Sequence, residues 1–286
     1  MEGDLPLVRV CALNGAARST IYHRRKRGPL LGRRPGPRTD IDDDDLVGLI
    51  RLVLKNSPFA GEGYRKVRAR LRREHDVKVS GKRVLRLMRR EGLLAPQRVT
   101  GRRARRPHDG TIIPEAPNLR WGTDATMAWT REDGWVWVFV NVDHFTAEAW
   151  TYVSKIGDRI AALDPVYQAV IDRFGSLDAD IARGIELRHD WGPQYRSHHF
   201  GGTIKWLGMI ASPAYIGEPE TNGCAERFIR TLKEQCLWVQ VCDTIDDLRI
   251  EVADFTHRYN NEWLIGRHGH QTPREAFHQH ATPMAA

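Results

Sequence analysis

Runs of apolar residues in the second half of the chain predict a β-sheet. Residues 119–129 alternate between two faces, so Trp121 and Asp124 point to opposite sides of a strand. Residues 134–143 are almost continuously apolar, as is typical of a central strand covered on both faces. The alternating aromatic side chains of that strand are expected in the core: Trp135, Trp137 and Phe139. The pattern predicts four strands, at 119–129, 134–143, 147–154 and 185–190.

Helical patterns follow and separate these strands. Asp164 and Pro165 are expected to cap and open one helix, because proline is favoured in a first helical turn. A second helix is expected to open at Thr221 or Asn222, whose side chains suit a helix N-cap. The order of three strands, helix, strand and helix predicts an α/β fold, a mixed sheet with flanking helices.

The first part of the chain is expected to be helical. Residues 1–40 have the pattern of a helical hairpin, broken at Gly15 and capped again at Ser19, followed by a linker rich in Pro, Gly and Arg. Residues 41–96 carry apolar stripes at helical spacing, with Ser80 as an N-cap, and predict a small basic all-α, helix-turn-helix-like region. The sequence therefore predicts a division of the chain into four segments. These are the hairpin and linker at 1–40, a basic helical DNA-binding domain at 41–96, a basic linker at 97–116, and an α/β core with C-terminal helices at 117–286.

Charge is distributed unevenly along the chain. Residues 1–110 hold 28 Lys and Arg against 12 Asp and Glu, whereas the rest of the chain holds 16 against 24. Each Lys or Arg on a phosphate releases counterions, so the basic half is expected to bind nucleic acid. A basic surface that only aids solubility is the alternative. The candidate DNA contacts in this half are Arg65, Lys66, Lys82, Arg83 and Arg86.

Three acidic residues of the second half lie in strongly apolar surroundings. Asp124 is in the middle of a strand, Asp190 ends another, and Glu226 falls near the first turn of a helix, with 35 residues between it and Asp190. At about 100° per residue, the apolar residues of that helix form one stripe. Glu226, Arg230 and Lys233 then lie side by side on its flank.

Converging carboxylates repel one another, and a divalent cation relieves that repulsion. Oxygen-only ligands select hard cations such as Mg²⁺, and two such ions can activate an attacking oxygen and stabilise a leaving one at a phosphodiester. Nearby basic side chains would then bind phosphates of the same strand: Arg227, Arg230 and Lys233. For Glu226 alone, an ion pair with Arg230 explains the pattern equally well.

The chain resembles the catalytic cores of retroviral integrases and, more closely, the second-frame transposases of the "insertion sequence three" family. The resemblance rests on WGTDAT at 121–126, VDHFT at 142–146, RHDWGPQY at 188–195, NGCAERFIRTLKE at 222–234, YNNEW at 259–263 and RHGHQTPREAF at 267–277. It extends to GYRKV at 63–67 and KRVLRLMRREGL at 82–93, and so covers nearly the whole chain.

This resemblance implies a ribonuclease H-like fold with a catalytic and metal-binding triad of Asp124, Asp190 and Glu226, and a basic DNA-end position at Lys233. The implied reaction is attack on phosphodiesters with two Mg²⁺ or Mn²⁺ ions, first by water and then by a DNA 3′-hydroxyl. Double-stranded DNA, as element ends and target, is the implied partner, bound by a homo-oligomer. The short stretch before the first linker suggests that a first-frame subunit supplies end recognition.

Several positions depart from the family pattern. His189 stands where Ser is usual, Trp191 where a small or charged residue is usual, and Thr221 and Gly223 flank Asn222 where Asp and Ala are usual. These departures leave the acids intact but put the rate and the local DNA contacts in question.

Other readings stay open. Asp143 ends a neighbouring strand and is a rival to Asp124 as the first acid. A catalytically decayed DNA-binding regulator and a nuclease without joining activity are the alternative functions. No apolar run is long enough to span a membrane and no secretory signal is evident, so a cytoplasmic, nucleoid-associated bacterial protein with no membrane partner is expected.

Overall fold

The computed structural model describes residues 7–13, 15, 17–19, 22, 41–96, 114–213 and 222–280. The chain divides into two compact units, Met1–Asp42 and Asp43–Ala286. In the first unit, α1 (Leu7–Leu13) precedes a turn at Gly15, whose φ of +61° suits glycine. Most of the second helix expected here, and both basic linkers, lie outside the described residues.

Three short helices open the second unit: α3 (Asp43–Asn56), α4 (Tyr64–His75) and α5 (Gly81–Arg90). Ser80 caps α5 as expected, because its side chain accepts a hydrogen bond from the Arg83 backbone N–H. The apolar stripes of the three helices meet in a small buried core of Leu46, Val47, Ile50, Val53, Val67, Leu71, Val84, Leu87 and Met88.

A five-stranded mixed sheet follows, in the order β3-β2-β1-β4-β5. Its first three strands are antiparallel: β1 (Arg120–Thr130), β2 (Gly134–Asp143) and β3 (Ala149–Ser154). The remaining two, β4 (Glu186–His189) and β5 (Ile210–Pro213), run parallel to β1. This is the mixed, ribonuclease H-like sheet with flanking helices that the sequence predicted.

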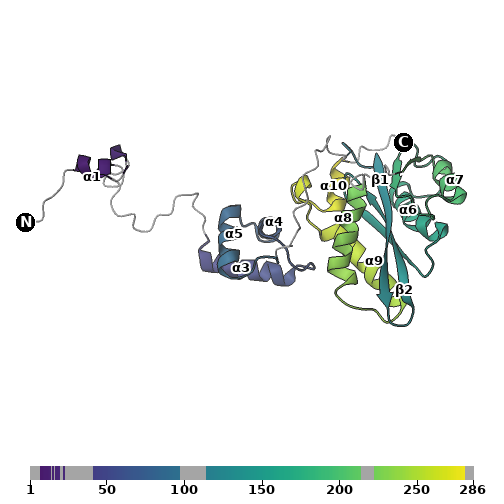
Figure 1. Ribbon diagram of the computed structural model, residues 1–286, viewed down its shortest axis with the longest axis horizontal. Coiled ribbons are helices and arrows are strands. Elements are labelled where there is room, and N and C mark those ends of the chain that lie inside the picture. Colours follow the sequence, from purple (N-terminus) through teal and green to yellow (C-terminus); the bar gives the residue numbers. More distant parts are fainter. Residues whose placement is uncertain are drawn as a thin grey trace, which may run out of the picture. The chain divides into compact units, whose positions relative to one another are not determined.

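Helices cover both faces of this sheet (Figure 1). On one face lie α6 (Arg159–Phe174) and α7 (His198–Trp206). On the other lie α8 (Gly223–Leu232), which continues into a π-helical turn at Lys233–Leu237, and α9 (Ile245–Glu262). A 3-10 turn at Gly266–His268 leads to the last helix, α10 (Pro273–His280).

Two apolar clusters fill the spaces between sheet and helices. Trp121 and Phe139 belong to the cluster under α6 and α7, whereas Val138, Val140 and Ala128 belong to the cluster under α8 and α9. Because successive strand residues face opposite sides, Gly122 and Asp124 face α8. The alternation of the sequence thus decides which helix Asp124 meets.

The structure corrects three details of the predicted elements. The N-cap of helix α6 is Asp158, six residues before Asp164: its side chain accepts hydrogen bonds from two backbone N–H groups, and Pro165 lies inside the helix. Trp135 is 58% exposed, because it lies near the hairpin end of β2 and packs edge-on against Trp129 rather than in the core. The third strand begins at Ala149 rather than at residue 147, because Ala147 has a φ of +60°.

None of the described helices is both long and apolar enough to cross a lipid bilayer.

Candidate functional site

Three neighbouring elements bring the predicted acids toward one region. Asp124 lies mid-way along β1, Asp190 directly follows β4, and Glu226 lies in the first turn of α8. Strands β1 and β4 are adjacent and parallel, and α8 packs over β1 and β2. The acids that are far apart in sequence therefore share one edge of the fold.

Asp124 is the most buried of the three. The pKa of its carboxyl group is raised to about 6, chiefly by burial and to a smaller extent by the negative charges of Asp190 and Glu226. A hydrogen bond from the Ala125 backbone N–H and the positive charge of Lys233 act in the opposite direction. Asp190, Glu226 and Lys233 are therefore close enough to Asp124 for their charges to change its pKa.

The loop that carries Asp190 is held by its own backbone and by aromatic packing. The Gly192 N–H donates to Asp190 Oδ1 at 2.9 Å, and His189 Nδ1 lies 2.8 Å from the Asp190 carbonyl oxygen. The buried His189 ring stacks on Tyr195 with centroids 5.8 Å apart. His189, an unusual residue at this position, therefore supports the loop from the core, and Asp190 itself remains exposed.

Helix α8 presents the mixed flank that its sequence predicted. Ala225, Phe228, Ile229 and Leu232 are buried against the sheet, whereas Glu226, Arg227 and Arg230 are exposed. Arg230 forms an ion pair with Glu234 at 3.0 Å. Lys233 opens the π-helical turn, a local widening often found at functional sites.

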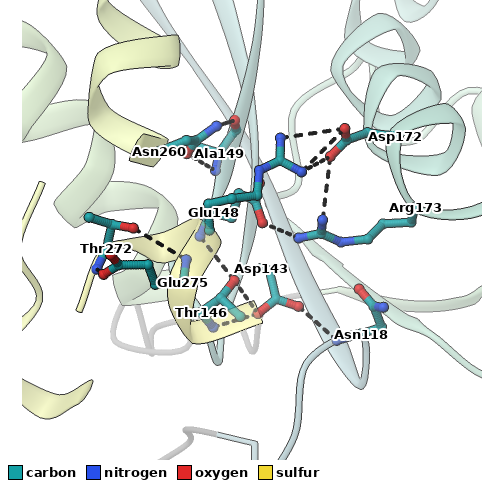
Figure 2. A network of polar contacts seen from close by, with 11 residues as sticks. Asn118, Asp143, Thr146, Glu148, Ala149, Asp172, Arg173, Asn260, Thr272 and Glu275 are labelled. Carbon is teal, nitrogen blue, oxygen red and sulfur yellow. Dashed lines mark hydrogen bonds and ion pairs between the residues drawn. The ribbon is translucent and has the colours of Figure 1, made fainter. Parts of the chain in front are cut away.

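Asp143, the rival first acid, serves another purpose. Its carboxylate is buried and accepts three hydrogen bonds: from the Asn118 N–H at 2.8 Å, the Thr146 N–H at 2.6 Å and the Thr146 hydroxyl at 3.0 Å (Figure 2). These bonds close the turn after β2 and tie it to the segment before β1. With both oxygens engaged by donors, Asp143 is a structural carboxylate.

The basic residues predicted on the helical region differ in how they are placed. Arg65 and Lys82 are exposed. Arg83 and Arg86 both pair with Asp43, at 2.8 and 2.7 Å, and hold the pKa of that carboxyl far below its usual range.

Lys66 does not fit a phosphate contact. Its Nζ is buried and lies 2.9 Å from the centroid of the Trp263 ring. Burial lowers the pKa of this ammonium group to about 7, although Glu62 acts to raise it. The surface of the helical region therefore offers phosphates Arg65, Lys82, Arg83 and Arg86, but not Lys66.

The donor set suits a hard divalent cation, since it consists of carboxylate oxygens that repel one another. In the part of the chain that the structure describes, no three His, Cys, Asp or Glu side chains are already gathered closely enough to hold a metal ion. Asp190 and Glu226 are exposed, whereas Asp124 is half-buried. A cation bound there would relieve the charge repulsion that raises the pKa of Asp124.

Sequence reasoning missed three buried polar side chains around the acids. Tyr195 is almost completely buried, and burial together with the charge of Asp124 raises the pKa of its hydroxyl. His144 and Asn222 meet beneath the first turn of α8. All three lie inside the motifs VDHFT, RHDWGPQY and NGCAERF, but nothing in a single sequence separates a polar residue that faces inward from one that faces solvent.

Two family models match the chain. An "HTH-like domain" matches residues 42–100, and an "Integrase core domain" matches residues 209–273. Among curated proteins, the chain is similar to the transposase InsD of insertion element IS2A/D/F/H/I/K from Escherichia coli, with 27% identity over 284 residues, covering 96% of this chain and 91% of that protein. The InsD transposase of IS2D from Escherichia coli strain K12 matches to the same extent.

Solved integrase structures also match the chain, at low sequence identity. The catalytic core of BIV integrase is 20% identical, with a TM-score of 0.42, and the match covers 57% of this chain and 95% of that one. A simian T-cell lymphotropic virus intasome chain is 16% identical, with a TM-score of 0.49, over 86% of this chain and 76% of that one.

Proposed function

We propose that this chain, a homologue of the insertion-sequence transposases with an integrase core, cuts and joins DNA with divalent metal ions held by Asp124, Asp190 and Glu226. The observation that carries the assignment of residues is geometric: β1, the end of β4 and the first turn of α8 bring Asp190 and Glu226 close enough to act on the carboxyl group of Asp124. Its pKa is raised to about 6 and responds to both other acids and to Lys233, although these residues come from three separate elements. Perturbed carboxyl groups of this kind cluster at functional sites.

We assign each acid a role that follows from its position. Asp124, fixed in β1 by sheet pairing, is the anchoring ligand, and Asp190 and Glu226 complete the site from the end of β4 and from α8. Two Mg²⁺ or Mn²⁺ ions bound there would supply an activated oxygen nucleophile and stabilise the leaving oxygen of a phosphodiester.

Basic side chains beside the acids orient the DNA strand. Lys233, Arg227 and Arg230 lie on α8 or directly after it, and their charges suit the phosphates next to the scissile one. Arg65, Lys82, Arg83 and Arg86 of the HTH-like domain would bind a further stretch of duplex. Because Arg83 and Arg86 already share Asp43, the cost of exchanging that partner for phosphate makes their contacts weaker than those of Arg65 and Lys82.

The assembly that does this is proposed to be a homo-oligomer on double-stranded DNA, pairing two element ends with a target, in the bacterial cytoplasm at the nucleoid. A first-frame subunit that supplies part of end recognition belongs to the same proposal. Tight, specific binding of element ends by this chain alone would remove the need for that subunit.

A cleavage and joining assay on labelled DNA with the element's ends tests the function. The wild-type chain is expected to give joined products with Mg²⁺ or Mn²⁺ and none in EDTA, and Asp190→Asn is expected to bind DNA but not to join it. A chain that cuts without ever joining would be a nuclease. A chain that never cuts, even with a first-frame subunit, while a 1–110 fragment binds the ends equally well, would be a DNA-binding regulator.

A further inference from the structure

Gly122, His144 and Asn222 meet at the start of α8, outside the group of acids. Gly122 lies in β1, His144 directly follows β2, and Asn222 is the residue before α8. A Cβ atom on Gly122 would lie 2.4 Å from Asn222 Oδ1 and 2.5 Å from His144 Nε2. The two polar side chains therefore occupy a space that only glycine leaves open.

Both side chains are buried, and each exposes a polar atom to the other. His144 is 2% exposed and Asn222 is 5% exposed. Among the described residues, neither His144 Nε2 nor Asn222 Oδ1 has a regular hydrogen-bond partner elsewhere. Their mutual geometry falls short of a regular hydrogen bond too, but the Asn222 amide acts on the His144 ring electrostatically as a bonding partner does. With its proton on Nε2, the ring would present a donor to the Asn222 Oδ1 acceptor.

The protonation of His144 agrees with this pairing. The pKa of its ring is lowered to about 4, chiefly by burial and to a smaller extent by the positive charges of Arg120 and Arg188. The ring is therefore neutral at physiological pH and carries a single N–H, whose place is decided by the acceptor it meets.

Asn222 connects this histidine to the strand that carries Asp124. Its Nδ2 donates to the Thr123 carbonyl oxygen at 3.1 Å, one residue before Asp124. Although Asn222 is the N-cap residue of α8, its side chain makes no capping bond. The amide that was expected to cap the helix is directed into the sheet instead.

The turn that holds His144 is itself anchored. The His144 carbonyl oxygen accepts a hydrogen bond from Arg267 Nη2 at 2.8 Å, and the Cys224 thiol of α8 lies 3.7 Å from it. The end of β2, the start of α8 and the segment before α10 therefore hold one another in place.

We infer that His144 and Asn222 are positioning residues, which fix the first turn of α8 and thereby place Glu226 opposite Asp124. Glu226 lies one turn beyond Asn222, about 6 Å along the helix, and Asp124 lies two residues beyond Gly122, about 7 Å along the strand on the same face. The pairing over Gly122 thus sets the register between α8 and β1. This inference rests on the proposed roles of Asp124 and Glu226.

Two substitutions of His144 in the full chain separate positioning from bulk structure. His144→Leu removes the ring N–H and is expected to lower both joining and Mn²⁺ affinity by roughly 10–100-fold, as loss of a residue supporting a metal ligand does. His144→Gln keeps an amide N–H that reaches Asn222 and is expected to restore most of both. Equal activity of His144→Leu and wild type would overturn the inference, and so would a folded His144→Gln that is as impaired as His144→Leu.

An independent measurement uses the metal-free wild-type protein and does not depend on DNA-joining activity. Nitrogen NMR of the His144 ring is expected to show the neutral form with the proton on Nε2 down to pH 6, and this signature is expected to be lost in Asn222→Ala. A proton on Nδ1 would contradict the pairing. If the NMR result holds and wild type joins no DNA even with a first-frame subunit, the proposed function fails while the contact stands.

Gly122→Ala gives a third measurement. Its new Cβ would displace Asn222 and His144, so hydrogen exchange in the first turn of α8 is expected to quicken. Gly201→Ala, where a Cβ meets nothing within 4 Å, is the matched control and is expected to leave α8 unchanged. Unchanged exchange in Gly122→Ala would count against the register role.

Discussion

At the scale of single residues, the fold places Asp124 where its ionised carboxylate is unfavourable. Burial in β1 and two neighbouring acids make its ionised form costly, so its pKa rises to about 6. A cation is the natural counterpart of such a carboxylate. The free-energy cost of ionising Asp124 in the folded protein can be measured without DNA, because it lowers the stability of the metal-free protein.

The first prediction is therefore a pH-dependent gain in stability for Asp124→Asn. The folded-state pKa exceeds the value of about 3.9 for an unfolded Asp, so wild type loses stability as pH rises from about 4 to 6 and carries the full cost above 6. In EDTA at pH 8, Asp124→Asn should be about 1–3 kcal/mol more stable than wild type. Urea unfolding at pH 4 and pH 8 checks this. A variant less stable than wild type at pH 8 would refute the charge argument.

The second prediction concerns Asp143, whose buried carboxylate accepts three hydrogen bonds from donors. Asp143→Asn brings an NH₂ group against one of these donors and should cost about 1–3 kcal/mol of stability. The fraction that remains folded should still join DNA, unlike Asp124→Asn. Unfolding curves and joining per folded molecule decide the matter, and a stable but inactive Asp143→Asn would return Asp143 to the catalytic role.

At the scale of elements, the sequence predicted β1, β2 and the buried stripe of α8 because their patterns are long or strongly periodic, and it also predicted the short strand β4. It missed α7 and β5, which are short and weakly patterned. The predicted start of helix α6 was too late in the sequence. Proline is favoured in a first helical turn, so Pro165 indicates a first turn, whereas the observed N-cap is Asp158.

The same limit applied to the site. The three acids could be selected from the sequence, but the separate roles of Asp143 and Asp190 could not. Both end a strand in an apolar setting, and only the tertiary fold shows that donors surround one carboxylate while the other is exposed. The sequence could not predict that the Asn222 side chain points into the sheet, because its partners come from β1 and from the end of β2.

The third prediction concerns how α10 is held to the core. Glu148 is fully buried and pairs with Arg173 of α6 and with Arg274 of α10, and both arginines also pair with Asp172 (Figure 2). Glu148→Gln leaves Arg173, itself 1% exposed, without its buried counter-charge and should cost about 3–5 kcal/mol. Hydrogen exchange in α10 should quicken as well.

Asp172→Asn is the matched control for this network. Asp172 is 32% exposed, so its loss should cost at most about 1 kcal/mol. Urea unfolding of both variants measures the difference. If the two cost the same, the network is a surface feature and does not anchor α10.

At the scale of the whole molecule, charge is divided between two tasks. The basic first part, which includes the HTH-like domain, is suited to holding DNA, whereas the more acidic second part carries the three carboxylates. A carboxylate site repels DNA phosphates unless cations intervene. Productive DNA binding at the core should therefore need divalent metal, while binding by the basic part should depend mainly on salt.

The most direct test of the central claim is strand joining by wild type, Glu226→Gln and Glu234→Gln on the same element-end DNA with Mg²⁺. The two variants remove one carboxylate each from consecutive segments, α8 and the π-helical turn. Glu226→Gln should bind DNA but join it more than about 100-fold more slowly, and Glu234→Gln should stay within a few-fold of wild type. A Glu226→Gln protein that joins DNA as well as Glu234→Gln would show that the carboxylates do not form the catalytic metal site.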